Sequence, residues 1–70
     1  MVDVERLREA MSDSGMTIKA IANKSGILRE TLYNKLSGRT EFTVSEAERL
    51  ASTLHLTKAE TYNIFFAREV

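Results

Sequence analysis

Positive charge is concentrated in the middle of this chain, where it could bind an anion. Residues 19–39 contain one acidic side chain, Glu30, and five basic ones, which gives this segment a net charge of +4. The basic residues are Lys19, Lys24, Arg29, Lys35 and Arg39. Segments 1–18 and 40–70 each carry a net charge of −2, so the 70-residue chain is neutral overall. Because local charge matters more to an anionic partner than the total, this pattern favours a nucleic-acid partner over merely solvated helix faces.

The sequence offers little for catalysis or metal binding. It has no cysteine and a single histidine, His55, which stands between two leucines at the end of a helical pattern. We interpret His55 as a partly buried residue rather than a general base. There is no nucleophile–base pairing, no glycine-rich phosphate loop and no metal-ligand spacing. We therefore expect no enzyme activity, no metal site and no cofactor.

The length and the apolar pattern limit the architecture. Seventy residues make a single domain, residues 1–70, because so short a chain holds only one core. The N-terminus is charged, and no apolar run approaches the ~18 residues of a membrane span. We therefore expect a cytoplasmic protein with neither a signal peptide nor a membrane helix. The absence of proline and the helical spacing of apolar residues predict an all-α fold of five helices without strands.

Polar caps and glycines predict where these helices begin and end. Asp3 and Thr17 are suited to cap the first two helices. Two capping boxes, each a threonine followed three residues later by a glutamate, begin the fourth and fifth helices. The boxes are Thr43–Glu46 and Thr57–Glu60. Gly15, Gly26 and Gly38 each follow an apolar-periodic segment, and they are predicted to end the first three helices.

The last two helices are predicted to supply much of the core. The fourth carries five apolar residues on one face, and Phe42 precedes it at the position of a hydrophobic staple. These five residues are Val44, Ala47, Leu50, Ala51 and Leu54. The fifth helix carries more apolar surface than one face needs. Its apolar residues are Ala59, Tyr62, Ile64, Phe65 and Phe66.

The central segment has the pattern of a helix-turn-helix. Two short helices are predicted at residues 18–25 and 29–36, with Gly26 between them. A tight turn between helices needs a residue that tolerates positive φ, and Ala22 is small where the second helix must cross the first. We expect both positions to be sterically closed, so that valine at either unfolds the domain. The expected buried residues of the unit are Ile18, Ile21, Ala22, Leu32 and Leu36.

Ala22, Gly26 and Leu32 have the spacing of the small residue, turn glycine and buried aliphatic residue of the phage repressor and Cro-like helix-turn-helix family, which this chain resembles. The run GILRETLYNKLSGRTEF, residues 26–42, is similar to that family's recognition helix and the loop after it. The resemblance covers most of the chain, and the nearest likeness is to small phage-encoded regulators. It implies a five-helix, repressor-like domain that binds double-stranded DNA and regulates transcription.

Three positions depart from the family's pattern. Ile18 stands where the family often has a glutamine that touches the DNA backbone. Leu28 replaces the usual serine or threonine cap of the recognition helix, and Lys35 stands at a position that is normally aliphatic. These departures bear on the phosphate contacts and on the rotation of the helix in the groove.

The resemblance implies that the helix at residues 29–36 lies in the major groove with its N-terminal half toward the base edges. The predicted base contacts are Arg29, Glu30, Thr31, Tyr33 and Asn34. The arginine, glutamate and asparagine carry the groups that pair with guanine, cytosine and adenine. Thr31 could equally be a surface residue without a DNA contact, and Tyr33 could instead lie across the loop around Phe42. The predicted phosphate contacts are Thr17, Lys19, Lys35, Ser37, Arg39 and Thr40.

One such domain reads only a few base pairs, so we expect a homodimer on a two-fold symmetric operator. The predicted dimer seam is Tyr62, Phe65 and Phe66. The alternative is that these aromatic rings are buried in the core and close it. The alternative function is a protein-binding helical module, such as an antirepressor or antitoxin subunit, that has the same fold without reading DNA. The neutral net charge and the missing glutamine favour this alternative, and the +4 central segment opposes it.

Overall fold

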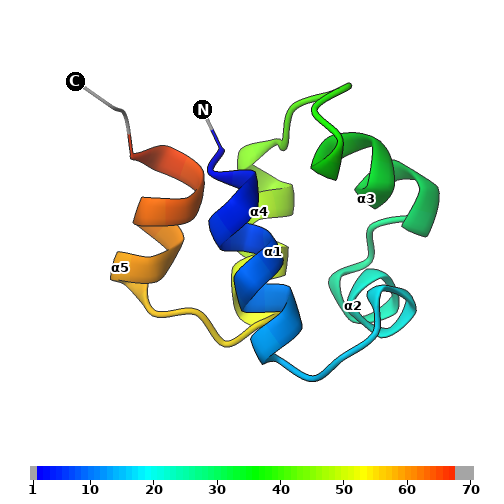
Figure 1. Cartoon of the computed structure of the whole chain (residues 1–70), viewed down its shortest axis with the longest axis horizontal. Helices are drawn as coiled ribbons and strands as arrows, with labels where there is room; N and C mark the ends of the chain where they lie inside the picture. Colours follow the sequence, from blue (N-terminus) through cyan, green and yellow to red (C-terminus); the bar gives the residue numbers. More distant parts are fainter. Residues whose placement is uncertain (1, 68–70) are drawn as a thin grey trace.

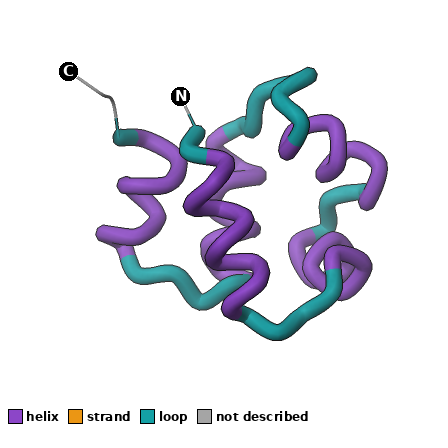
Figure 2. The backbone as a smooth tube through the Cα atoms, in the orientation of Figure 1, coloured by secondary structure: helices purple, strands orange, loops and turns teal. Residues whose placement is uncertain are grey.

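The computed structural model describes residues 2–67, and within this range the chain forms helices and no strand. The elements are α1 (Val4–Asp13), α2 (Ile18–Ser25), α3 (Arg29–Leu36), α4 (Val44–Thr53), α5 (Lys58–Thr61) and a π-helical turn, η1 (Tyr62–Phe66), which continues α5. The prediction of an all-α fold with five helices is confirmed. Figure 1 shows α2 and α3 together at one end of the molecule and α5 at the other, with α1 and α4 between them. Short loops join these helices (Figure 2). None of the helices described is long and apolar enough to cross a membrane.

Polar caps form at every predicted helix start except one. The side chain of Asp3 accepts from the amide of Arg6, and that of Thr17 from the amide of Ala20, both at 3.1 Å. In the capping boxes of α4 and α5, each threonine hydroxyl accepts from the glutamate amide at 3.1 Å, and each glutamate carboxylate accepts from the threonine amide at 2.8 Å. The exception is α3, because Leu28 at its N-cap has no side-chain acceptor.

Gly26 ends α2 in the left-handed conformation, with φ at 72° and its amide donating to the carbonyl of Ala22. A Cβ added at Gly26 would come no closer than 3.4 Å to a neighbour, the Nη1 atom of Arg49. The expectation that Gly26 is sterically closed is therefore wrong. Glycine is favoured here by its positive φ, which costs other residues roughly 1–2 kcal/mol. Ala22, in contrast, lies inside the core.

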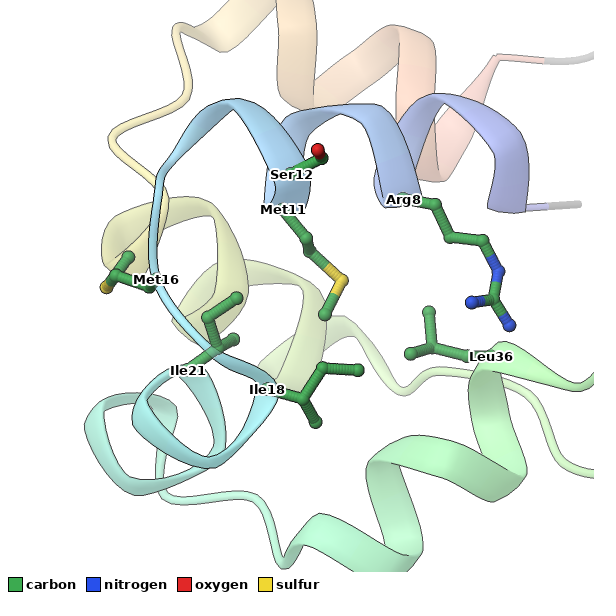
Figure 3. Close-up of a pocket in the computed structure, with 7 residues that line it drawn as sticks. All are labelled: Arg8, Met11, Ser12, Met16, Ile18, Ile21 and Leu36. Carbon is green, nitrogen blue, oxygen red and sulfur yellow. The ribbon is translucent and has the colours of Figure 1, made fainter.

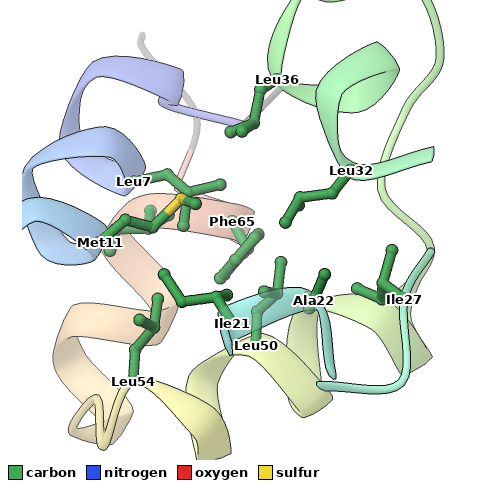
Figure 4. Close-up of a cluster of buried hydrophobic side chains, with 12 residues drawn as sticks. Leu7, Met11, Ile21, Ala22, Ile27, Leu32, Leu36, Leu50, Leu54 and Phe65 are labelled. Carbon is green, nitrogen blue, oxygen red and sulfur yellow. The ribbon is translucent and has the colours of Figure 1, made fainter. Parts of the chain in front are cut away.

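The core fills the space between α1, α2, α3, α4 and η1 (Figure 4). Its buried members are Leu7, Met11, Ile21, Ala22, Ile27, Leu32, Leu36, Ala47, Leu50, Leu54, Ile64 and Phe65. Four of the five residues predicted to be buried in the helix-turn-helix are among them, and the fifth, Ile18, is half-buried against the cluster. The core therefore fixes α2 and α3 to the rest of the domain.

Two residues near the ends of α4 differ from their predicted burial. Val44 is 63% exposed, because it lies in the first turn of α4, ahead of the buried face that starts at Ala47. His55 is exposed rather than partly buried, and it adopts a φ of 56° in the turn that follows α4. Histidine enters this left-handed region more readily than most residues other than glycine.

The aromatic residues of η1 are divided between the core and the surface. Phe65 is buried and packs edge-on against Phe42, with 5.8 Å between ring centroids and 77° between ring planes. The prediction that Phe65 belongs to a dimer seam is therefore wrong, since its ring closes the core. Tyr62 and Phe66 remain 57% and 41% exposed. They are four residues apart on this wide helical turn, whose last bond runs from the amide of Ala67 to the carbonyl of Tyr62.

Candidate nucleic-acid interface

The helix α3 has a buried side that anchors it and an exposed side that faces away from the domain. Leu32 and Leu36 lie in the core. Arg29, Glu30 and Tyr33 are exposed, at the positions one, two and five of the helix that share its outer face. Within residues 2–67, no hydrogen bond or ion pair engages these three side chains. Their polar groups are therefore available to a partner.

Thr31 and Asn34 lie at the border of the exposed side of α3. Both side chains are half-buried. The backbone carbonyl of Asn34 accepts from the Ser37 hydroxyl at 2.9 Å and from the Arg39 amide at 3.0 Å, which closes the end of the helix. The carboxamide of Asn34 is not used in these bonds. Asn34 thus combines a structural backbone role with a side chain beside the exposed face.

Lys35 is buried, and the prediction that it contacts phosphate is wrong. Its Nζ atom donates to the carbonyl of Glu41 at 2.7 Å and lies 2.9 Å from Oε1 of Glu46. Its ammonium group is also 5.9 Å from the centre of the Phe42 ring. Lys35 lies in the last turn of α3 and its partner Glu46 in the first turn of α4, so an aliphatic stem that ends in a charge suits this position. Lys35 joins α3 to α4 instead of facing solvent.

Glu46 is the shared acceptor of this connection. One carboxylate oxygen, Oε1, receives both the Thr43 amide of the capping box and the ammonium group of Lys35. Burial raises the pKa of Glu46, but the hydrogen bonds from Thr43 and Lys35 and the charge of Lys35 outweigh burial, so that the pKa lies below its ordinary value of 4.5. The carboxylate is therefore ionised at neutral pH and holds the start of α4 and the end of α3 together.

The remaining predicted phosphate contacts form two exposed groups. Thr17 and Lys19 lie at the start of α2, while Ser37, Arg39 and Thr40 lie in the loop that leaves α3. All five side chains are exposed. In the second group the amides of residues 38 and 39 and the hydroxyl of Ser37 already donate to carbonyls of α3, so the side chains of Arg39 and Thr40 are the groups left for an anion. The structure brings these residues to both ends of the α2–α3 unit (Figure 1).

A basic residue outside the central segment also faces the helix-turn-helix. Arg8 of α1 borders a mostly apolar recess of about 180 Å³ between α1, α2 and the end of α3, and its guanidinium extends toward Leu36 (Figure 3). The net charge of segment 1–18 is negative, so the segment charges gave no indication that Arg8 faces the helix-turn-helix. The position of Arg8 in the sequence does indicate it, because Arg8 follows Leu7 and stands three residues before Met11, and both of these residues are buried.

The comparisons with known proteins agree with this geometry. A family model described as a helix-turn-helix domain matches residues 4–62, from the first residue of α1 to the first residue of η1. No curated protein and no solved structure shows significant similarity to the chain. The match spans α2, α3 and the helices that support them, which is well over half of the 70 residues. The chain belongs to the helix-turn-helix domain family.

Proposed function

We propose that this chain is a small transcriptional regulator of the repressor and Cro type, like those that phages encode, and that it binds double-stranded DNA sequence-specifically. The exposed N-terminal half of α3 enters the major groove, the usual position of the second helix of this motif. The observation that most supports the proposal is that Arg29 and Glu30 project from a firmly anchored helix without any partner among the described residues. Arginine pairs with the O6 and N7 atoms of guanine, and glutamate accepts from the amino group of cytosine.

The two exposed groups beside α3 suit the DNA backbone. Thr17 and Lys19 would contact one strand, and Ser37, Arg39 and Thr40 the other, because they lie at the two ends of the α2–α3 unit. Such contacts fix the orientation of the protein without reading sequence.

Selection of bound duplexes from a random pool tests this function. We expect an enriched motif of two inverted half-sites with centres about 10 base pairs apart, the geometry of a two-fold symmetric helix-turn-helix dimer. An asymmetric motif would contradict the dimer but keep the reading role of α3. A pool without enrichment would contradict DNA reading and support the alternative of a protein-binding module.

The dimer is proposed to form through the exposed rings of Tyr62 and Phe66. They lie on η1, at the opposite end of the molecule from α3, so a second copy there leaves both reading helices free. Aromatic side chains are enriched at protein interfaces because each removes a large apolar surface from water.

We expect Phe66→Ser to shift the chain from dimer to monomer in sedimentation equilibrium at micromolar concentration. The ring is 41% exposed, so the fold tolerates the change while the seam loses its apolar contact. Val44→Ser is the matched control, because Val44 is also an exposed apolar residue but belongs to α4 and is not part of the proposed seam. A wild-type monomer in the presence of the selected duplex, or an unchanged Phe66→Ser dimer, would contradict this seam.

A further inference from the structure

Leu28 is the most exposed of the large apolar side chains in the part of the chain that the structure describes, at 77% of its surface. It is the N-cap residue of α3, with φ at −59° and ψ at 139°, and it makes no capping hydrogen bond. Its neighbour Ile27 is 4% exposed and supplies the apolar anchor of this turn. Leu28 therefore lies outside the core and contributes nothing to the cap.

Folding alone gives no reason for a leucine at this position. Serine, threonine, aspartate or asparagine would satisfy an amide at the start of α3 and stabilise the helix, as happens at the other four α-helices. An exposed leucine also gains none of the free energy that burial of its side chain would bring. A side chain that weakens a helix start and stays in water is suited to a contact with a partner.

The position of Leu28 identifies the chemistry of that contact. It precedes Arg29 and Glu30, the exposed polar residues at the N-terminal end of α3. If this end enters the major groove, a leucine there meets base edges that present hydrogen-bonding groups and one aliphatic group, the 5-methyl of thymine.

We propose that Leu28 determines specificity by packing against the 5-methyl group of a thymine in the operator. This inference rests on the proposed function and deepens it, since it predicts one base of the recognised sequence. An arginine and a glutamate beside it would select guanine and cytosine, so the leucine extends the reading to a base pair that these residues do not recognise.

Deoxyuridine substitution tests the contact, because it removes the thymine methyl and leaves the base pair intact. Each thymine of the duplex selected by the wild-type chain is replaced in turn, and the dissociation constants of wild type and of Leu28→Ala are measured. We expect one thymine per half-site at which uridine weakens wild-type binding about fourfold, the equivalent of ~0.8 kcal/mol for one buried methyl group. Leu28→Ala should bind the selected duplex and the deoxyuridine-substituted duplex with equal affinity.

Two further variants separate this role from folding and from general apolar effects. Leu28→Ser restores a cap and carries no methyl group, so we expect its Tm to rise by about 4–8 °C while its sensitivity to uridine disappears. Val44→Ala truncates another exposed aliphatic residue and should keep the full wild-type sensitivity. The proposal would be overturned if the Leu28 variants select the same motif as wild type and if deoxyuridine substitution weakens their binding as much as it weakens wild-type binding.

The outcomes distinguish this inference from the proposed function. If the wild-type chain selects no DNA motif, both the proposed function and the thymine contact are contradicted. If the selected motif contains no thymine, or if deoxyuridine at each of its thymines leaves the affinity unchanged, only the thymine contact is contradicted. The DNA-reading role of α3 then remains.

Discussion

Arg29→Ala should weaken binding to the selected duplex by roughly 5- to 150-fold per half-site, corresponding to the 1–3 kcal/mol of one bidentate pair with guanine. The side chain is exposed and has no hydrogen-bond or ion-pair partner within residues 2–67, so we expect the Tm to remain unchanged. The loss should fall on the selected duplex, whereas random DNA should lose only the small contribution of one positive charge.

Lys24→Ala is the matched control for this change. Lys24 is exposed in the last turn of α2 and is not among the proposed contacts, so the variant loses the same charge without losing a base contact. We expect its affinity for the selected duplex to be close to that of wild type. Equal losses of Arg29→Ala on selected and random DNA would contradict base reading by Arg29.

Glu46→Ala should lower the free energy of unfolding by about 3 kcal/mol. Removal of one partner leaves the ammonium group of Lys35 buried with only the carbonyl of Glu41, and it also breaks the capping box of α4. The estimate lies at the low end for buried ion pairs because the two side chains keep 9% and 13% of their surface in water. Urea unfolding at pH 7 measures the change.

The double variant Lys35→Met with Glu46→Gln is the control for this prediction. It removes both charges but keeps an apolar stem on α3 and an amide oxygen able to accept from Thr43. Replacement of a buried pair by neutral groups of similar shape is often close to neutral, so we expect most of the stability to return. A double variant as unstable as Glu46→Ala would show that the charge pair itself is indispensable.

The same pair makes stability depend on pH. The pKa of Glu46 is lower in the folded protein than its ordinary value of 4.5, so its contribution is fully present above that pH. The contribution is lost as the pH falls below 4.5 through the lower folded pKa, where protonation removes the charge that Lys35 faces. The wild-type chain should therefore lose more stability than Glu46→Gln between pH 7 and pH 3 in urea titrations.

Local signals explain why so much of the fold could be predicted from the sequence. Asp3 and Thr17 accept from amides three residues ahead, and Gly26 takes the positive φ that a short turn requires. Each of these features depends on residues within one helical turn, so the residue types alone indicate them. The buried Leu32 and Leu36 follow from the same local spacing.

The wrong predictions for Lys35 and Phe65 arise where side chains from different segments of the chain meet. Lys35 looks like a surface lysine until Glu41 and Glu46 approach it from the following segment, and a capping-box glutamate carries no sign of a second partner. Phe65 and Phe66 are adjacent, and their different burial depends on which ring reaches Phe42. Helical spacing cannot decide between them, because the π-helical turn changes the angle at which each side chain leaves the chain.

The proposed base-contact residues could be named from the sequence only through the helix-turn-helix resemblance. The fold then places Arg29, Glu30 and Tyr33 outward on one helix face, and it removes Lys35 from the surface. In the sequence, Leu28 is distinguished only by standing where a polar capping residue is expected, since exposure is a property of the folded chain. Because Leu28 is 77% exposed in the folded chain, we propose it as a base contact.

Titration of the ¹⁵N-labelled chain with the selected duplex, followed through amide chemical shifts, tests most directly whether α3 reads DNA. We expect the largest shifts at residues 28–34, with smaller ones at residues 17–19 and 37–40, where phosphate contacts are proposed. The middle of α4 should stay unchanged, because its inner residues Leu50 and Ala51 lie in the core. Shifts that are largest on α1 or η1, with residues 28–34 unaffected, would contradict a DNA-reading role for α3.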